Sequence, residues 1–128
     1  MATLNELKKY KYYEFSSGPY TGDDYKQFQT KYINYLRSVC RLNGWELVNV
    51  GRNHYCFSAF IKDGYKCVYL SISDVRGRNN EWLNRILIRC AKHEKDYHGA
   101  SNNYCSLDNL TGEVSKLLEW WDYEGFND

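Results

Sequence analysis

The sequence predicts an α+β domain of two layers, in which an antiparallel sheet carries a long N-terminal helix and a C-terminal helix on one face. Two helical stripes of apolar residues, in residues 23–43 and 107–122, flank segments in residues 45–91 that are typical of strands. The expected order is α-β-β-β-β-α, with three to four strands in the sheet. The length of 128 residues fits one domain over residues 1–128, because most domains hold about 100–150 residues.

The first helix is expected from Asp23 to Asn43. Thr21 and Asp24 resemble a capping box, and Asn43-Gly44 indicates a left-handed end. The segment Ser16–Gly22 holds the only proline and predicts a turn, preceded by an N-terminal arm or short helix in residues 1–15. The apolar side chains recur at steps of three and four residues and form one stripe: Tyr25, Phe28, Tyr32, Leu36, Val39 and Leu42.

A strand is expected over Trp45–Val50, followed by a hairpin of His54–Ile61 and Tyr65–Ser73 around Asp63-Gly64, a pair typical of a type I′ turn. With a two-residue loop, Ile61 faces Lys66. One hairpin face is apolar and should face the core: Tyr55, Phe57, Ala59, Ile61, Val68, Leu70 and Ile72. The opposite face is typical of neither a core nor a solvent surface: His54, Cys56, Ser58, Phe60, Cys67, Tyr69, Ser71 and Ser73.

Residues 81–92 fit either a helix or a strand, and the β-branched residues favour a short helical turn around Trp82 followed by a strand over Arg85–Ala91. The last helix is expected from Leu107 to Asp122, and residues 123–128 form an acidic tail. Its apolar stripe consists of Leu107, Leu110, Val114, Leu117, Leu118 and Trp121.

Charge and polar loops indicate where binding could occur. The net charge of +1 divides into −5 in residues 108–128 and +6 in the rest, which suggests a basic patch beside an acidic end that contacts something cationic; the alternative is an ordinary solvated surface. Residues 74–78 and 93–104 form two polar loops, which could equally be plain surface turns. The candidate binding residues are Arg76, Arg78, Arg85, Arg89, His93, Lys95, Tyr97, Asn102, Asn103 and Tyr104.

Neither a catalytic centre nor a metal or cofactor site is expected. The five cysteines form no CxxC pair, so reduced thiols in a cytoplasmic protein are expected, several of them packed as small hydrophobes. A nucleophile built from His54 with Cys56 or Cys67 would need a lowered thiol pKa and a base in contact. The two histidines of residues 93–98 match no common metal-ligand spacing. No apolar run reaches the roughly 18 residues of a membrane span, and no secretory leader is visible.

Three segments carry a resemblance to known proteins: WELV at residues 45–48, FSAFIKDGYKCVYLSISDVR at 57–76, and ILIRCAKHEKDYHGASNNYCSLDNL at 86–110. Over residues 16–118 the chain resembles a family of small uncharacterised proteins of Firmicutes plasmids, conjugative elements and prophages. That family has no settled catalytic motif, so the resemblance assigns no site residue. Small proteins of mobile elements include anti-defence inhibitors such as anti-CRISPR proteins, and the resemblance therefore implies a protein of this kind.

The sequence leaves three functions open. The first is a non-enzymatic inhibitor from a mobile element or phage, whose partner is a host protein or ribonucleoprotein. The second is direct binding of nucleic acid by the basic residues between Arg76 and Lys95. The third is a nucleotide-binding protein or small enzyme that uses the His93–Tyr104 loop.

Overall fold

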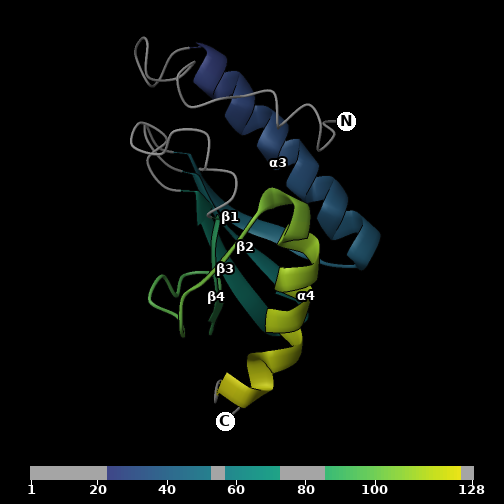
Figure 1. Cartoon of the computed structure of the whole chain (residues 1–128), viewed down its shortest axis with the longest axis vertical. Coiled ribbons are helices and arrows are strands. Elements are labelled where there is room, and N and C mark those ends of the chain that lie inside the picture. The colour runs from purple at the N-terminus through teal and green to yellow at the C-terminus, as the bar shows by residue number, and fades with distance from the viewer. Residues whose placement is uncertain (1–22, 53–56, 73–85, 125–128) are drawn as a thin grey trace.

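The structure is a computed structural model that describes residues 23–52, 57–72 and 86–124 (Figure 1). It has the predicted α+β class and the predicted order of elements, with α3 (Asp23–Asn43) before the sheet and α4 (Leu110–Trp120) after it. The sheet has five strands rather than three to four: β1 (Glu46–Arg52), β2 (Phe57–Asp63), β3 (Lys66–Ile72), β4 (Ile86–Ala91) and β5 (Asn103–Cys105). Short 3-10 turns, Leu107–Asn109 and Trp121–Glu124, flank α4. The sequence did not indicate β5, because three residues are too few for an alternating pattern.

The strands form a meander in the order β1-β2-β3-β4-β5, each antiparallel to the next. The predicted hairpin register is wrong: Ile61 lies opposite Val68 rather than Lys66, which pairs with Asp63. The turn begins one residue later than predicted, at Gly64, whose φ of 64° suits glycine. The two-residue change of partner keeps every side chain on its predicted face.

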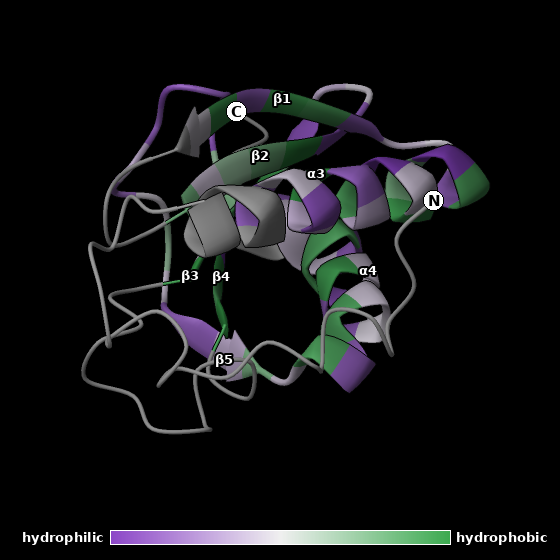
Figure 2. Cartoon of the chain, turned by 90° about the horizontal axis from the view of Figure 1, so that it is seen from above, coloured by the Kyte–Doolittle hydropathy of each residue, from purple (hydrophilic) through white to green (hydrophobic). Residues whose placement is uncertain are grey.

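Both helices cover one face of the sheet (Figures 1 and 2). The hairpin side chains predicted for the core do lie there as far as they are described, from Phe57 to Ile72, each at most 2% exposed. The apolar stripe predicted for the last helix is confirmed in full, since all six of its side chains are at most 4% exposed. At the end of this helix the Trp121 indole N–H donates a hydrogen bond of 2.8 Å to the carbonyl of Ala91. This bond joins the helix to the end of β4.

The bounds of α3 are those predicted, but its buried stripe differs from the prediction. The buried side chains of its described part are Gln29, Tyr32, Ile33, Leu36 and Cys40, whereas Leu42 is 86% exposed. A helix turns by about 100° per residue, so Leu42 lies roughly 240° around the axis from Leu36 and points away from the core.

The helix ends at Asn43 and is followed by Gly44, whose φ is 73°, and the Trp45 N–H donates a hydrogen bond of 2.8 Å to the Cys40 carbonyl of the last turn. This bond pattern is that of a Schellman motif, so the left-handed end predicted from Asn43-Gly44 is confirmed.

The strand predicted over Arg85–Ala91 is confirmed as β4, from Ile86 to Ala91. Several other predictions lie outside the described residues: the turn at residues 16–22, the arm at 1–15, the helical turn at Trp82, and the pair His54 and Cys56. Across the described ranges, no helix combines the length and apolar character needed to cross a membrane.

Candidate binding surface

The sheet face opposite the helices carries a small apolar cluster, and the loop of residues 92–102 lies over it. Phe60, Cys67 and Ala91 are fully buried there. The Tyr97 ring packs edge-on at 5.2 Å from the ring of Phe60 and 5.7 Å from that of Tyr69. The residues of this hairpin face are typical of neither a core nor a solvent surface, and the loop explains why. The face is covered by a loop instead of a helix or water. Tyr97 fills the space above Phe60 and Tyr69.

Asp96 fixes the turn at the centre of the loop. Its carboxylate accepts hydrogen bonds from the backbone N–H groups of Lys92 at 2.9 Å and Gly99 at 3.0 Å, while its own N–H donates to the His93 carbonyl at 3.1 Å. Desolvation alone would raise the pKa of this carboxyl group, but hydrogen bonds from the amides of Gly99, Lys92 and His98 outweigh it, and the pKa is lowered from 3.8. The ionised side chain therefore holds the loop at neutral pH.

Arg89 of β4 fixes the loop from the side of the sheet. Its guanidinium group lies 4.8 Å from the centre of the Tyr69 ring and donates a hydrogen bond of 3.0 Å to the side-chain oxygen of Asn102. A second N–H of the same group donates to the carbonyl of Tyr97. Both partners belong to the loop or its end, so Arg89 positions the loop.

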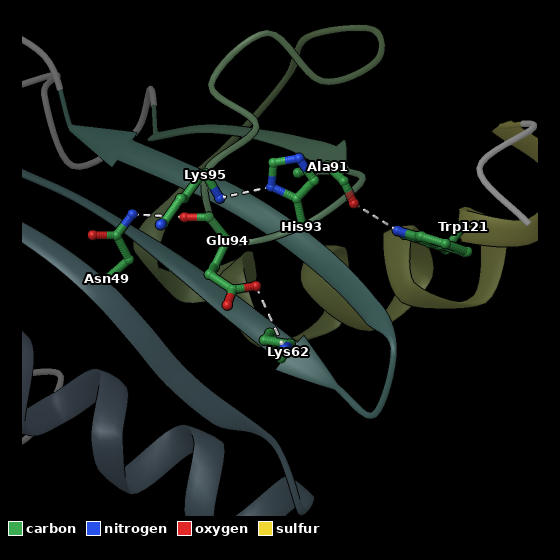
Figure 3. Close-up of polar contacts among 7 residues, drawn as sticks. All are labelled: Asn49, Lys62, Ala91, His93, Glu94, Lys95 and Trp121. Atoms are coloured by element: carbon green, nitrogen blue, oxygen red, sulfur yellow. Dashed lines mark hydrogen bonds and ion pairs between the residues drawn. The ribbon is translucent and has the colours of Figure 1, made fainter.

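Asn49 fixes the loop from the other edge of the sheet (Figure 3). Its side-chain nitrogen donates to the carbonyl of Glu94 at 2.6 Å and to the hydroxyl of Tyr97 at 3.0 Å. An irregularity in the pairing of β1 with β2 lies at this point, and Asn49 has a φ of 49°. The bulge thus directs a side chain of β1 to a loop more than forty residues away.

Gly99 allows the end of the loop to approach β4. It has a φ of 58°, and a Cβ atom at this position would lie 2.4 Å from the carbonyl oxygen of Cys90. The next residue, Ala100, donates its N–H to that same carbonyl at 2.9 Å. Only glycine fits this close approach without displacing the backbone.

Seven of the ten candidate binding residues lie within the described part of the chain, on β4, the loop and β5, whereas Arg76, Arg78 and Arg85 lie outside it. Five of the seven are exposed: His93, Lys95, Asn102, Tyr97 at 48% and Tyr104 at 55%. The polar side chains of four of the seven make hydrogen bonds within this region. They are Arg89 and Asn102, which bond each other; His93, whose Nδ1 accepts the Lys95 N–H at 3.1 Å; and Asn103, which donates to the Ser101 carbonyl at 3.1 Å.

Three residues that organise this surface were not among the candidates: Asn49, Asp96 and Gly99. Asp96 and Gly99 carry a signal that could have been used, because Asp at the first position and Gly at the fourth are typical of a type I turn. Asn49 lies in the predicted strand and Gly51 directly follows that strand, which is a weak sign of a bulge. No local pattern indicates that Asn49 bonds to residues 94 and 97.

The buried thiol beneath the loop is not activated. Burial raises the pKa of Cys67 to about 12, so its side chain is a protonated thiol at neutral pH. Cys40, Cys67, Cys90 and Cys105 are buried and form no disulfide with one another, as expected for thiols packed as small hydrophobes. In the described ranges no three or more His, Cys, Asp or Glu side chains gather as they would around a metal ion.

Comparisons with protein families, with curated proteins and with solved structures find no match to this chain. The resemblance to proteins of mobile elements therefore stays a prediction.

Proposed function

We propose that this chain is a non-enzymatic binding protein of a bacterial mobile element, and that it inhibits host defence or nucleic-acid machinery in the manner of an anti-CRISPR protein. The resemblance of residues 45–48, 57–76 and 86–110 supplies the biological setting. Its contact surface, which we name the loop surface, consists of exposed Lys92, Lys95, Tyr97 and Tyr104. Its partner is a host protein or ribonucleoprotein.

The observation that carries this proposal is the fixed conformation of residues 92–102. Asp96, Arg89 and Asn49 hold the loop from within and from two different strands. Binding by a loop that is already ordered avoids the entropy cost of ordering it against a partner. A polar loop fixed by this many side chains is suited to present its outer residues to a partner in one arrangement.

The residue types on the loop surface also favour protein binding. Tyrosine is enriched among the residues that dominate binding energy, because its ring supplies a large contact area and its hydroxyl a polar contact. The acidic groups beside the lysines are already engaged: the Glu94 carboxylate lies 3.5 Å from the Lys62 ammonium group, and the Asp96 carboxylate accepts backbone N–H groups. Lys92 and Lys95 thus set the charge that the loop presents outward.

The test is capture from a lysate of a defended host, combined with a plaque assay in that host. The wild-type chain should retain a defence protein and reduce the effectiveness of defence. The double variant Lys95→Glu with Tyr104→Ser should lose both effects while unfolding at the same temperature. Lys116→Glu, which reverses a charge on α4, is the matched control and should behave as wild type. Failure of the wild-type chain to alter defence, or equal losses in both variants, would contradict the proposal.

Nucleic-acid binding is the second candidate, favoured by the presence of two lysines and an exposed tyrosine on one loop. Lysines neutralise phosphates, and an exposed ring can stack on a base. In mobility-shift assays with single-stranded and structured RNA and DNA, the affinity should fall steeply as salt increases. The same Lys95→Glu, Tyr104→Ser variant should reduce the slope of that dependence. Affinity that does not change with salt would exclude phosphate contacts as its source.

A further inference from the structure

A second surface of the molecule carries the opposite charge and a pocket. The pocket has a volume of about 220 Å³ and lies where the start of β1, the β2–β3 turn and α4 meet. Its lining comprises Trp45, Asp63, Lys66, Ser115, Leu118 and Glu119. Because α4 forms one wall, the pocket lies on the helix side of the sheet, whereas Tyr97 of the loop surface packs on Phe60 and Tyr69 on the other side.

Two carboxylates dominate the charge of this pocket. Among the described lining residues, Lys66 is the one cation, and its ammonium group lies 3.7 Å from the carboxylate of Asp122, which offsets its charge. Asp63 and Glu119 are both exposed and line the pocket from different elements, one from the hairpin and one from α4. Glu119 also belongs to the segment 108–128, which contains six acidic residues and one lysine. The pocket therefore attracts a cation.

The apolar part of the lining favours a cation on a hydrocarbon stem. Trp45 packs partly against the main core, and Leu118 is only 4% exposed. An indole can attract an ammonium or guanidinium group through its ring face, and the neighbouring leucine can contact methylene groups. A hydrated inorganic ion would gain nothing from these two side chains.

The walls of the pocket are held in place before any ligand arrives. The Trp45 N–H is fixed to the Cys40 carbonyl at the end of α3. The hairpin turn is fixed to the end of α4, because the Tyr65 ring packs edge-on against the Trp121 ring at 5.4 Å and Trp121 bonds to Ala91. Three elements thus meet in a fixed arrangement, which favours binding.

We infer that this pocket binds the side chain of an arginine or lysine in a basic segment of a protein partner. Its volume is below the roughly 300–1,000 Å³ of sites for small-molecule ligands and fits one side chain better. The assignment to a protein rests on the proposed function, whereas the affinity for a cationic group does not. An arginine or lysine would place its stem against Trp45 and Leu118 and its charge between Asp63 and Glu119.

The experiment is a titration followed by ¹H–¹⁵N NMR, with the full chain and short capped peptides as probes. A peptide with two adjacent arginines should cause saturable shifts at the Trp45 indole and at the amides of residues 63, 66, 115 and 119. The same peptide with citrulline in place of arginine should bind at least about threefold more weakly, since citrulline keeps the shape and loses the charge. Agmatine, a free organic cation, should bind more weakly than the peptide.

Two double variants distinguish binding in the pocket from attraction to the acidic surface in general. Asp63→Asn with Glu119→Gln should weaken peptide binding by about three- to tenfold, the effect of removing two exposed ion pairs. Asp108→Asn with Glu113→Gln removes the same charge elsewhere and should leave the affinity unchanged. The site would be overturned if both double variants weakened peptide binding equally, or if the citrulline peptide bound as tightly as the arginine peptide. Equal affinity for agmatine would overturn the assignment to a protein partner. None of these results depends on the loop surface, so they can be distinguished from a failure of the proposed function.

Discussion

The two faces of the sheet are covered in different ways. On one face, α3 and α4 bury a continuous apolar core that extends from Tyr32 to Trp121. On the other face, an irregular loop covers a smaller cluster, whose buried residues within the described part of the chain are Phe60, Cys67 and Ala91. The first covering is held by apolar burial, and the second by hydrogen bonds from side chains far apart in the sequence.

This difference assigns the stability of the fold mainly to the helix face and the proposed binding to the loop face. Large apolar contacts on the helix face contribute most of the stability, because burial of each side chain contributes about 1.5–3 kcal/mol. The loop face contains few such contacts, so its polar residues can fix one loop conformation and leave other side chains exposed. The four predictions below test this division.

The largest effect is expected from truncation of a buried leucine on the helix face. Leu36→Ala should destabilise the fold by about 2–5 kcal/mol, because it leaves a cavity beneath α3. Leu36 is 0% exposed, whereas Leu42 on the same helix is 86% exposed. Leu42→Ala should therefore change the free energy of unfolding by less than about 0.5 kcal/mol. Urea denaturation followed by circular dichroism compares the two, and similar losses would contradict the buried stripe described above.

A smaller effect is expected when the loop loses its close approach to β4. Gly99→Ala places a methyl group 2.4 Å from the Cys90 carbonyl, at a φ of 58°, and should cost about 1–3 kcal/mol. Hydrogen exchange should increase in residues 92–102 and remain slow in α4, because the two coverings are held separately.

Gly112→Ala is the control for that change. Gly112 lies in α4 with nothing within 4 Å of an added Cβ, so alanine there should stabilise the protein by up to about 1 kcal/mol. Two substitutions of the same kind should thus act in opposite directions. Loss of stability in both would show that the close contact at Gly99 does not explain its effect.

The helix face could be predicted from sequence to a much greater extent than the loop face. The spacing of apolar residues along the last helix predicts the burial of Leu107, Val114 and Leu117. The pair Asn43-Gly44 predicts the end of the first helix. The faces of the hairpin were also predictable, although its register was not, because either Asp63-Gly64 or Gly64-Tyr65 can form the turn. The stripe extended to Leu42 was wrong because two steps of three residues from Leu36 place Leu42 roughly 240° around the helix axis, away from the core.

The loop face could not be predicted because its contacts join distant segments. Asn49 bonds to residues 94 and 97, and this pairing has no periodicity in the sequence. Arg89 was predicted as a binding residue from its charge, and its guanidinium group donates to Asn102 and to the Tyr97 carbonyl, two contacts that its charge did not indicate. Charge and polarity therefore located the loop, but they did not distinguish side chains that fix it from side chains that it exposes.

A third prediction concerns pH and Asp96. Because its pKa in the folded protein is lower than the usual 3.8, its contribution to stability is fully present above about pH 4 and is lost as pH falls through the lower folded value. The amide signals of Lys92 and Gly99 should titrate with Asp96 below pH 3.8 in NMR spectra. In Asp96→Asn this titration should be absent, whereas Asp108→Asn should retain it. Titration of both amides near pH 5 would contradict the bonds described for the carboxylate.

The smallest effect is expected at the ion pair between Lys62 and Glu94. The two groups lie 3.5 Å apart with side chains 28% and 43% exposed, so water and salt screen their attraction. A double-mutant cycle of Lys62→Gln and Glu94→Gln should give a weak coupling that disappears near 1 M salt, where the screening length is about 3 Å. Asn49 bonds the backbone carbonyl of Glu94, so Glu94→Gln keeps that bond while it removes the charge. Each single variant should therefore leave hydrogen exchange in residues 92–102 nearly unchanged. A strong coupling that survives high salt, together with faster exchange in the loop, would mean that charge rather than hydrogen bonding holds this face of the sheet.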